Sequence, residues 1–201
     1  MEFEFYNHQS KRLADRYNSL TFEELFEEFI CYLPSPKCNI LDVGAGSGRD
    51  SAWFEQKGYS VTAVEPSSNL LQEARSNYSS ADINWIQDSL PYLKKIKDSN
   101  QLFDIIWLSA VWMHVPLLER DETFKNLQCL LKNEGLLFIS LRIGSDEDDR
   151  NLYPVSSSEI LFLSKKYEMD EILVSDSTDL FERTGVIWKK YLFKKLSSSN
   201  Y

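Results

Sequence analysis

The stretch from Asn39 to Ser51 constrains the fold more than any other part of the chain, because it combines a strand, a glycine turn and a helix start. Its first residues, Asn-Ile-Leu-Asp-Val, are typical of a buried parallel strand. Gly44, Gly46 and Gly48 follow at once, and the residues from Asp50 onward predict the first turns of a helix. A Cβ in such a turn would block both the tight bend and the close approach of a ligand. Backbone N–H groups and the helix dipole can then face a bound molecule.

The spacing of these glycines separates two classes of ligand. Dinucleotide-binding turns follow the pattern G-x-G-x-x-G, but here the third glycine comes one position early and Arg49 occupies the required place. The pattern is instead G-x-G-x-G, preceded by the acid Asp42. Residues 40–48 resemble the first motif of class I S-adenosylmethionine-dependent methyltransferases. A glycine motif alone is weak evidence, so the rest of the chain has to decide.

Strands and helices alternate after the glycine turn. A helical lead-in over residues 10–33, with Thr21 as a predicted N-cap, ends at Pro34. Further strands are predicted at 60–65, 82–87, 102–108, 135–141, 171–174 and 186–193, and helices at 50–57, from 66, at 120–131 and at 157–167. Such alternation requires a parallel sheet, whereas the polar loop at 175–185 predicts a terminal antiparallel hairpin. We therefore expect an α/β fold: a Rossmann-like, seven-stranded, mostly parallel sheet with helices on both faces.

Length and composition bound the domain organisation and the partners. A chain of 201 residues predicts a single domain, with a helical lead-in at 1–36 over the cofactor site, a core at 37–195 and a frayed tail at 196–201. The net charge of −9 disfavours a nucleic-acid partner. No apolar run reaches about 18 residues, so no membrane span is expected. Three cysteines without metal-ligand spacing, and an N-terminus unlike a signal peptide, favour a cytoplasmic protein.

The resemblance to class I methyltransferases extends from about Tyr6 to Arg150. Val64-Glu65-Pro66-Ser67 follows the glycine turn at a suitable interval, and Phe103-Asp104-Ile105-Ile106 and Ala110-Val111-Trp112-Met113-His114 match the fourth strand and the segment after it. Together these motifs make the chain similar to small bacterial methyltransferases of the tellurite-resistance and ubiquinone-biosynthesis type. The resemblance implies S-adenosyl-L-methionine as the cofactor, S-adenosyl-L-homocysteine as its product, and in-line methyl transfer to a small-molecule acceptor.

Candidate cofactor contacts lie at the carboxyl ends of the strands, where ligands bind in an open parallel sheet. Glu65 is suited to accept both ribose hydroxyls, Asp88 to bind the adenine amino group, and Arg49 to pair with the carboxylate of the methionine end. Asp50 suits the ammonium group or caps the helix. Structural roles stay open as alternatives: Asp42 as a turn former, Asp88 as a helix cap, and Glu65 and Arg49 as surface residues. The candidates are Asp42, Gly44, Ala45, Gly46, Gly48, Arg49, Asp50, Glu65, Pro66, Ser67, Asp88, Ser89, Leu90, Ser109 and Tyr17.

The acceptor side carries fewer signals. His114 is predicted either as a general base or substrate contact, or as a structural residue. Tyr6 and Tyr17 either close over the cofactor and face its sulfonium or belong to the core. Arg142 and Arg150 either grip a carboxylate or phosphate, or pair with the acids at 146–149, which are interpreted as solvated and not as magnesium ligands. No metal site is expected, and the candidate substrate residues are Tyr6, Trp112, Arg142 and Arg150.

Other functions stay open. The alternative acceptors are RNA or a protein side chain, although the acidic charge disfavours RNA and no Asn/Asp-Pro-Pro-Tyr element follows the fourth strand. A non-catalytic cofactor-binding subunit is disfavoured by the intact Glu65 and Asp88. A nicotinamide-dependent reductase is disfavoured by Arg49 and by the terminal hairpin. The sequence leaves the identity of the acceptor, the use of a general base and the oligomeric state open.

Overall fold

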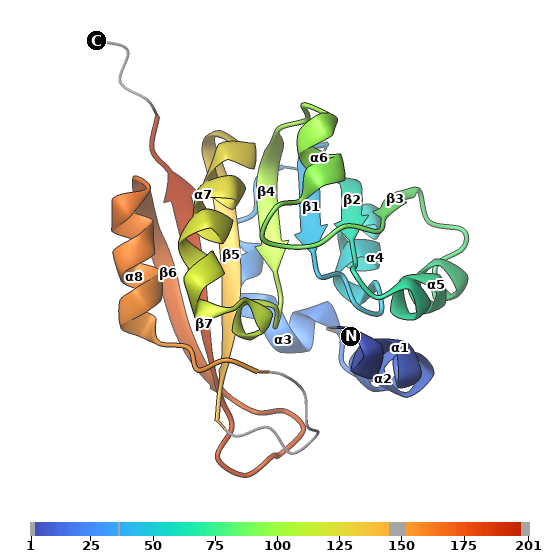
Figure 1. The fold of residues 1–201 in the computed structure, drawn as a ribbon. Helices are drawn as coiled ribbons and strands as arrows, with labels where there is room; N and C mark the ends of the chain where they lie inside the picture. Colours follow the sequence, from blue (N-terminus) through green and yellow to red (C-terminus); the bar gives the residue numbers. More distant parts are fainter. Residues whose placement is uncertain (1–2, 36, 145–151, 198–201) are drawn as a thin grey trace.

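A single twisted sheet organises the computed structural model, which describes residues 3–35, 37–144 and 152–197. Within these residues, seven strands are arranged in the order β3-β2-β1-β4-β5-β7-β6 (Figure 1). Parallel pairing joins the strands from β3 to β5, and β7 is antiparallel to both of its neighbours. The strands are β1 Asn39–Val43, β2 Ser60–Val64, β3 Ile83–Ile86, β4 Phe103–Leu108, β5 Leu131–Ile143, β6 Met169–Thr178 and β7 Ile187–Lys195. The expected seven-stranded, mostly parallel sheet with a terminal antiparallel hairpin is confirmed.

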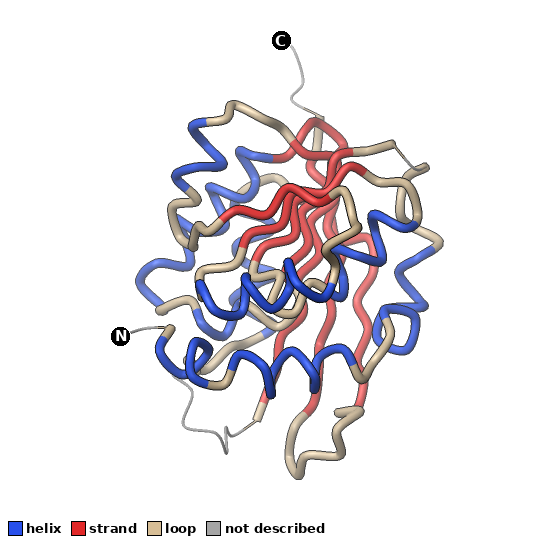
Figure 2. The backbone as a smooth tube through the Cα atoms, turned by 90° about the vertical axis from the view of Figure 1, so that its right-hand side faces the viewer, coloured by secondary structure: helices blue, strands red, loops and turns tan. Residues whose placement is uncertain are grey.

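Helices cover both faces of the sheet, as expected (Figure 2). One core cluster joins β1, β4 and β5 to α6, α7 and α8, and a second joins the opposite face to α3 and α4. In the second cluster the Trp107 and Phe138 rings are stacked 3.6 Å apart, with Phe26 edge-on to both. The helices are α1 Glu4–His8, α2 Ser10–Asn18, α3 Phe22–Ile30, α4 Arg49–Gln56, α5 Ser68–Asn77, α6 Lys94–Asp98, α7 Arg120–Leu130 and α8 Ser157–Lys166, with 3₁₀ turns η1 Trp112–His114 and η2 Leu117–Glu119.

The lead-in consists of three short helices where the sequence predicted one helical region. Thr21 caps α3, as predicted: its hydroxyl accepts the Glu24 N–H, and the Glu24 carboxylate accepts the Thr21 N–H. Asn7 anchors α1 to the start of α5, because its side-chain oxygen accepts hydrogen bonds from the Ser67 hydroxyl and the Asn69 N–H. Helices α1 and α2 lie beside α5 at the end of the sheet where the parallel strands finish, whereas α3 packs on a face of the sheet (Figure 1).

Some boundaries differ from the prediction. Helix α6 was not predicted, β5 begins four residues earlier, at Leu131, and β6 continues to Thr178 through part of the segment that was predicted to be a loop. The acidic segment at 145–149, Arg150 and the end of the tail lie outside the described residues. No helix in the described part of the chain is long and apolar enough to cross a membrane.

Candidate functional site

A cavity of about 520 Å³ lies at the carboxyl ends of the parallel strands. Its walls come from the lead-in, the glycine turn, the segments that follow β2, β3 and β4, and the β5–β6–β7 end of the sheet. Gly48, Ser67 and Trp112 lie behind this wall and do not line the cavity. The predicted site residues that do line it are Tyr6, Tyr17, Asp42, Gly44, Ala45, Gly46, Arg49, Asp50, Glu65, Pro66, Asp88, Ser89, Leu90, Ser109, His114 and Arg142.

The glycine turn uses most of its backbone donors internally, which differs from our expectation that they face a ligand. The Gly44 and Ala45 N–H groups both donate to the Val64 carbonyl, and the Gly48 N–H donates to the Ala45 carbonyl. The Gly46 N–H donates to the Glu65 carboxylate at 2.9 Å. The turn is therefore built as a carboxylate-braced bend, with few donors left for a phosphate group.

Two of the glycines are required for different spatial reasons. A Cβ on Gly44 would lie 2.4 Å from Cγ2 of Val111, so this glycine allows the segment after β4 to pack against the turn. A Cβ on Gly46 would meet nothing nearer than the Tyr17 ring at 3.6 Å, so this position faces the cavity beneath Tyr17. Both residues also have positive φ angles, 72° and 57°, which residues with a Cβ rarely adopt.

Glu65 lies at the end of β2 with its carboxylate buried against the glycine turn. One oxygen accepts the Gly46 N–H and the other accepts the Ser67 N–H, both at 2.9 Å. Burial raises the pKa of this carboxyl to about 7, and the two backbone hydrogen bonds oppose the shift. Each carboxylate oxygen retains a lone pair for a further donor. Ser67, predicted as a cofactor contact, caps α5 through its hydroxyl.

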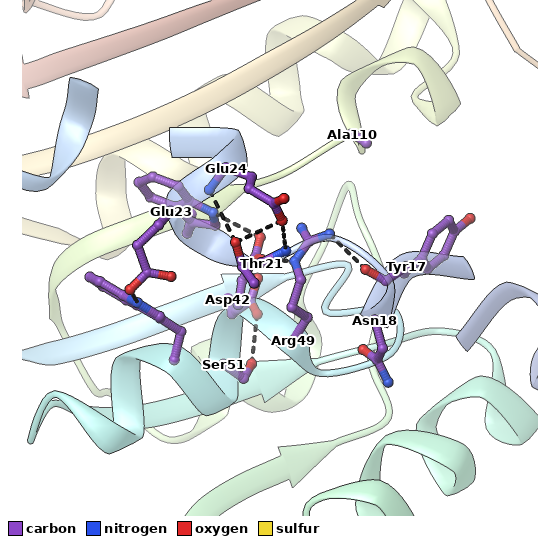
Figure 3. Close-up of polar contacts among 12 residues, drawn as sticks. Tyr17, Asn18, Thr21, Glu23, Glu24, Asp42, Arg49, Ser51 and Ala110 are labelled. Carbon is purple, nitrogen blue, oxygen red and sulfur yellow. Dashed lines mark hydrogen bonds and ion pairs between the residues drawn. The ribbon is translucent and has the colours of Figure 1, made fainter. Parts of the chain in front are cut away.

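A pair of acidic side chains lies under the turn, where Asp42 at β1 and Asp50 at α4 are close together. Asp42 is 1% exposed and accepts the Ser51 hydroxyl at 2.6 Å (Figure 3). Burial, followed by the neighbouring negative charge of Asp50, raises the pKa of Asp42 to about 7. Asp50 also accepts the indole N–H of Trp107 at 3.2 Å. Together with Glu65, these residues place three buried carboxyl groups on one side of the cavity.

Arg49 and Asp88 are both held by the protein itself. The Arg49 guanidinium pairs with Asp50 at 2.7 Å and donates to the Tyr17 carbonyl at 3.1 Å, which links α4 to the lead-in (Figure 3). The Asp88 carboxylate accepts the backbone N–H groups of Ser89, Lys95 and Ile96 and so caps α6. The capping alternative for Asp88 is thus present in the structure, and both side chains still line the cavity.

The segment after β4 forms the part of the cavity wall that lies below the lead-in. Ala110 has a left-handed φ of 60°, and its N–H donates to the buried hydroxyl of Ser140 at 2.8 Å. In η1, Nε2 of His114 lies 3.1 Å from the Tyr6 hydroxyl, and the two rings meet edge to face. Trp112, expected as a substrate contact, is instead fully buried and packs edge-on against Phe124.

Sequence reasoning missed several residues at the far end of the cavity. Ser140 of β5 and the β6–β7 residues Asp179, Trp188 and Lys190 line it beside the predicted Arg142. A signal for Ser140 was present, because Ser140 and Arg142 are the polar residues, at alternate positions, of the otherwise apolar stretch 136–143. No group of histidine, cysteine and acidic side chains suited to hold a metal ion is found among the described residues.

Comparisons with known proteins agree with this geometry. The family described as "Methyltransferase domain" matches residues 41–139. Mouse glycine N-methyltransferase is 32% identical over 117 residues, covering 51% of this chain and 40% of that protein. Ubiquinone biosynthesis O-methyltransferase of Coxiella burnetii is 32% identical over 102 residues, covering 51% and 42%. This chain therefore spans about two fifths of the length of these relatives.

Solved structures share the fold over nearly the whole chain. Magnesium protoporphyrin IX methyltransferase from Synechocystis, with bound S-adenosylhomocysteine, superposes with a TM-score of 0.73 at 12% identity, covering 96% of this chain and 97% of that chain. TehB from Haemophilus influenzae gives a TM-score of 0.69 at 17% identity, covering 93% and 67%. The glycine turn and the strand order agree with the family match: residues 41–139 of this chain form a methyltransferase domain, in the fold that S-adenosylmethionine-dependent methyltransferases share.

Proposed function

We propose that this chain binds S-adenosylmethionine and catalyses transfer of its methyl group to a small-molecule acceptor by in-line displacement. The observation that carries the proposal is the set of three buried carboxyl groups, Asp42, Asp50 and Glu65, around a glycine turn whose N–H donors are used internally. Such a site suits a ligand that presents positive charge and hydroxyl groups. It does not suit a pyrophosphate, which requires unused backbone donors.

The residues on the cavity wall fit the parts of this cofactor. We assign the ribose hydroxyls to the remaining lone pairs of Glu65, and Tyr17 covers the open position at Gly46. Asp50 and Arg49 suit the ammonium and carboxylate of the methionine end. The adenine group is assigned to the wall formed by Pro66, Asp88, Ser89 and Leu90. When bound, the cofactor supplies an electrophilic methyl group on a sulfonium.

On the acceptor side, we assign Tyr6 and His114 to the handling of a proton. Both line the cavity, and their hydrogen bond joins the lead-in to the segment after β4. A base is needed only when the acceptor loses its proton as it attacks, as a hydroxyl does. In that case the Tyr6 oxygen accepts the proton while Tyr6 passes its own to Nε2 of His114, provided that this nitrogen is the unprotonated one.

A small acceptor is supported by the size of the cavity and by the relatives, whose names refer to glycine and to ubiquinone biosynthesis. The net charge of −9 supports a small molecule over RNA, because an RNA substrate requires a basic surface. The alignments cover about two fifths of each relative, so the relatives support a small acceptor without identifying it.

A thermal-shift titration tests the cofactor. S-adenosylmethionine, S-adenosylhomocysteine, NAD⁺ and NADPH are added separately to the wild type, to Glu65→Ala and to Glu171→Ala, an exposed acid on β6 that serves as the control. Ligand at about 100 times its Kd stabilises by about 2.7 kcal/mol, a shift of several degrees. We expect this shift with the first two ligands alone, in the wild type and the control but not in Glu65→Ala. A shift with a nicotinamide alone, or with none of the four, would overturn the proposal.

A further inference from the structure

The sheet face beyond the segment after β4 changes from apolar to polar while it remains buried. On β5, Phe138 belongs to the core beneath α3, and Ser140 and Arg142 follow at alternate positions of the same face. Ser140 is 2% exposed and Arg142 is 5% exposed. Burying polar side chains where the core could continue is costly, so their presence indicates a role that an apolar residue cannot fill.

The neighbouring strands extend this polar face into a floor. Ser140 is paired with Lys190 of β7, and Arg142 is paired with Trp188, which is in turn paired with Ser177 of β6. Residues directly opposite one another share a face of the sheet. All five line the cavity, and we call them the polar floor. Because Ser140 contacts Ala110, and Arg142 lies about 7 Å further along the strand, the floor begins at the segment after β4 and leads away from it.

The β6–β7 connection closes the far side of this floor and is held rigidly. The Asp179 carboxylate accepts the backbone N–H and the guanidinium of Arg183 and the indole N–H of Trp188. The Phe181 ring contacts two guanidinium groups, with Arg16 of α2 at 4.6 Å and Arg183 at 5.6 Å from its centroid. These contacts tie the connection to β7 on one side and to the lead-in on the other.

The charges on the polar floor are not equivalent. The Lys190 ammonium donates to the Leu25 carbonyl and pairs with Glu28 at 3.0 Å, so its charge is balanced within the protein. Arg142 presents a planar guanidinium with five N–H donors, which allows it to bind a carboxylate in addition to the partners that it already has. The aromatic rings of Phe26, Phe181 and Trp188 also line the cavity; Trp188 is paired with Arg142, and the Phe26 ring centroid lies 5.6 Å from the Lys190 ammonium.

Resting on the proposed function, we propose that the polar floor is the acceptor site and that the acceptor is a compact aromatic carboxylate. Its carboxylate binds the Arg142 guanidinium, and its planar body lies against Trp188 and Phe26. The group to be methylated then points back along β5 towards Ser140 and the Tyr6–His114 pair. Arg142 and Trp188 are the specificity-determining residues of this arrangement.

The test is a binding measurement with a matched pair of probes. Benzoate and benzamide have the same shape and differ in charge, so the ratio of their Kd values isolates the carboxylate. Both are titrated calorimetrically into protein loaded with S-adenosylhomocysteine, which occupies the cofactor end of the cavity. The variants are Arg142→Met, Arg142→Lys, and Arg75→Met as the control, because Arg75 lies on α5 outside this cavity.

In the wild type and the control, benzoate should bind about tenfold more tightly than benzamide, as expected for a charge-assisted pair. Arg142→Met should abolish this preference. Arg142→Lys should keep part of it, and it provides the test if Arg142→Met does not fold. The Kd of S-adenosylhomocysteine should stay unchanged in all variants. Equal binding of the two probes to the wild type, or a preference retained in Arg142→Met, would overturn the inference. Failure of S-adenosylhomocysteine to bind would overturn the proposed function instead, and the probe ratio on unloaded protein would still decide the acceptor site.

Discussion

Binding of S-adenosylmethionine should depend on pH through the buried carboxyl groups Asp42 and Glu65. Burial raises both pKa values to about 7, and the nearby charge of Asp50 contributes at Asp42. Below pH 7 these groups therefore hold protons in the unliganded protein. A bound ligand with positive charge favours their ionised forms, so binding releases protons and strengthens as the pH rises.

The magnitude follows from the number of protons released. One proton per ligand corresponds to about tenfold in affinity, or about 1.4 kcal/mol, for each pH unit below the pKa. Between pH 5.5 and 7 the Kd should therefore fall about 15-fold for one carboxyl group, which is half ionised at pH 7, and further for two, and it should level off above pH 7. The folding stability of the unliganded protein should change in the opposite direction and decrease as the pH rises. Because the unfolded pKa values are about 3.9 and 4.3, the folded state binds more protons in this window, and its stability falls as the pH rises from about 4 to 7.

Calorimetry at pH 6 in two buffers of different ionisation enthalpy counts the released protons directly. We expect a release of about one to two protons in the wild type. In Asp42→Asn the count should fall, because the amide cannot titrate, while Glu171→Ala on the exposed face of β6 should match the wild type. A count of zero in the wild type, or an unchanged count in Asp42→Asn, would refute the assignment of a positively charged ligand to these carboxyl groups.

Three further predictions concern packing and the lead-in. Gly44→Ala should lower the free energy of unfolding by about 2–4 kcal/mol, from the positive φ and the clash with Val111, and Val111→Ala in the same chain should recover part of the loss in urea denaturation. Asn7→Ala removes the anchor of α1 on α5, so hydrogen exchange at residues 4–8 should accelerate with little change in Tm. Asp179→Ala leaves the Trp188 and Arg183 donors without their acceptor and should destabilise by about 1–3 kcal/mol, whereas Asp176→Ala, an exposed acid on β6, should have a small effect. An unchanged free energy of unfolding in Gly44→Ala would contradict the predicted clash. Unchanged hydrogen exchange of the α1 amides in Asn7→Ala would contradict the anchor, and equal destabilisation by Asp179→Ala and Asp176→Ala would contradict the role of Asp179.

The sequence predicted those elements whose signals are local. The strand predicted at 102–108 is found at Phe103–Leu108, and the Thr21 cap is present with its Glu24 partner. Helix α6 was missed because it is only five residues long and its cap, Asp88, comes six residues before its start. The end of β6 was missed because an edge strand exposes alternate residues and its sequence there is polar.

The site was predicted in its membership but not in its internal contacts. Most candidates line one cavity, because the carboxyl ends of parallel strands meet at one edge of the sheet. The sequence holds no information on which partner each group takes, such as Tyr6 with His114 or Asp88 with the start of α6, because these contacts join distant segments. Lys190 and Trp188 were missed for the same reason, since the β5–β7 register that brings them beside Arg142 is set by tertiary packing.

Under the proposed function, the glycine turn sorts adenosine-containing molecules by the charge that follows the ribose. ATP and S-adenosylmethionine share the adenosine group, but one continues as a triphosphate and the other as a sulfonium with an amino acid. The turn has already used the Gly44, Ala45, Gly46 and Gly48 N–H groups, and carboxyl groups surround it. A triphosphate entering adenosine-first would meet repulsion with few donors to offset it. We therefore expect the turn to disfavour ATP relative to S-adenosylmethionine, and excess ATP should compete poorly for this cavity above pH 7, where Asp42 and Glu65 are ionised.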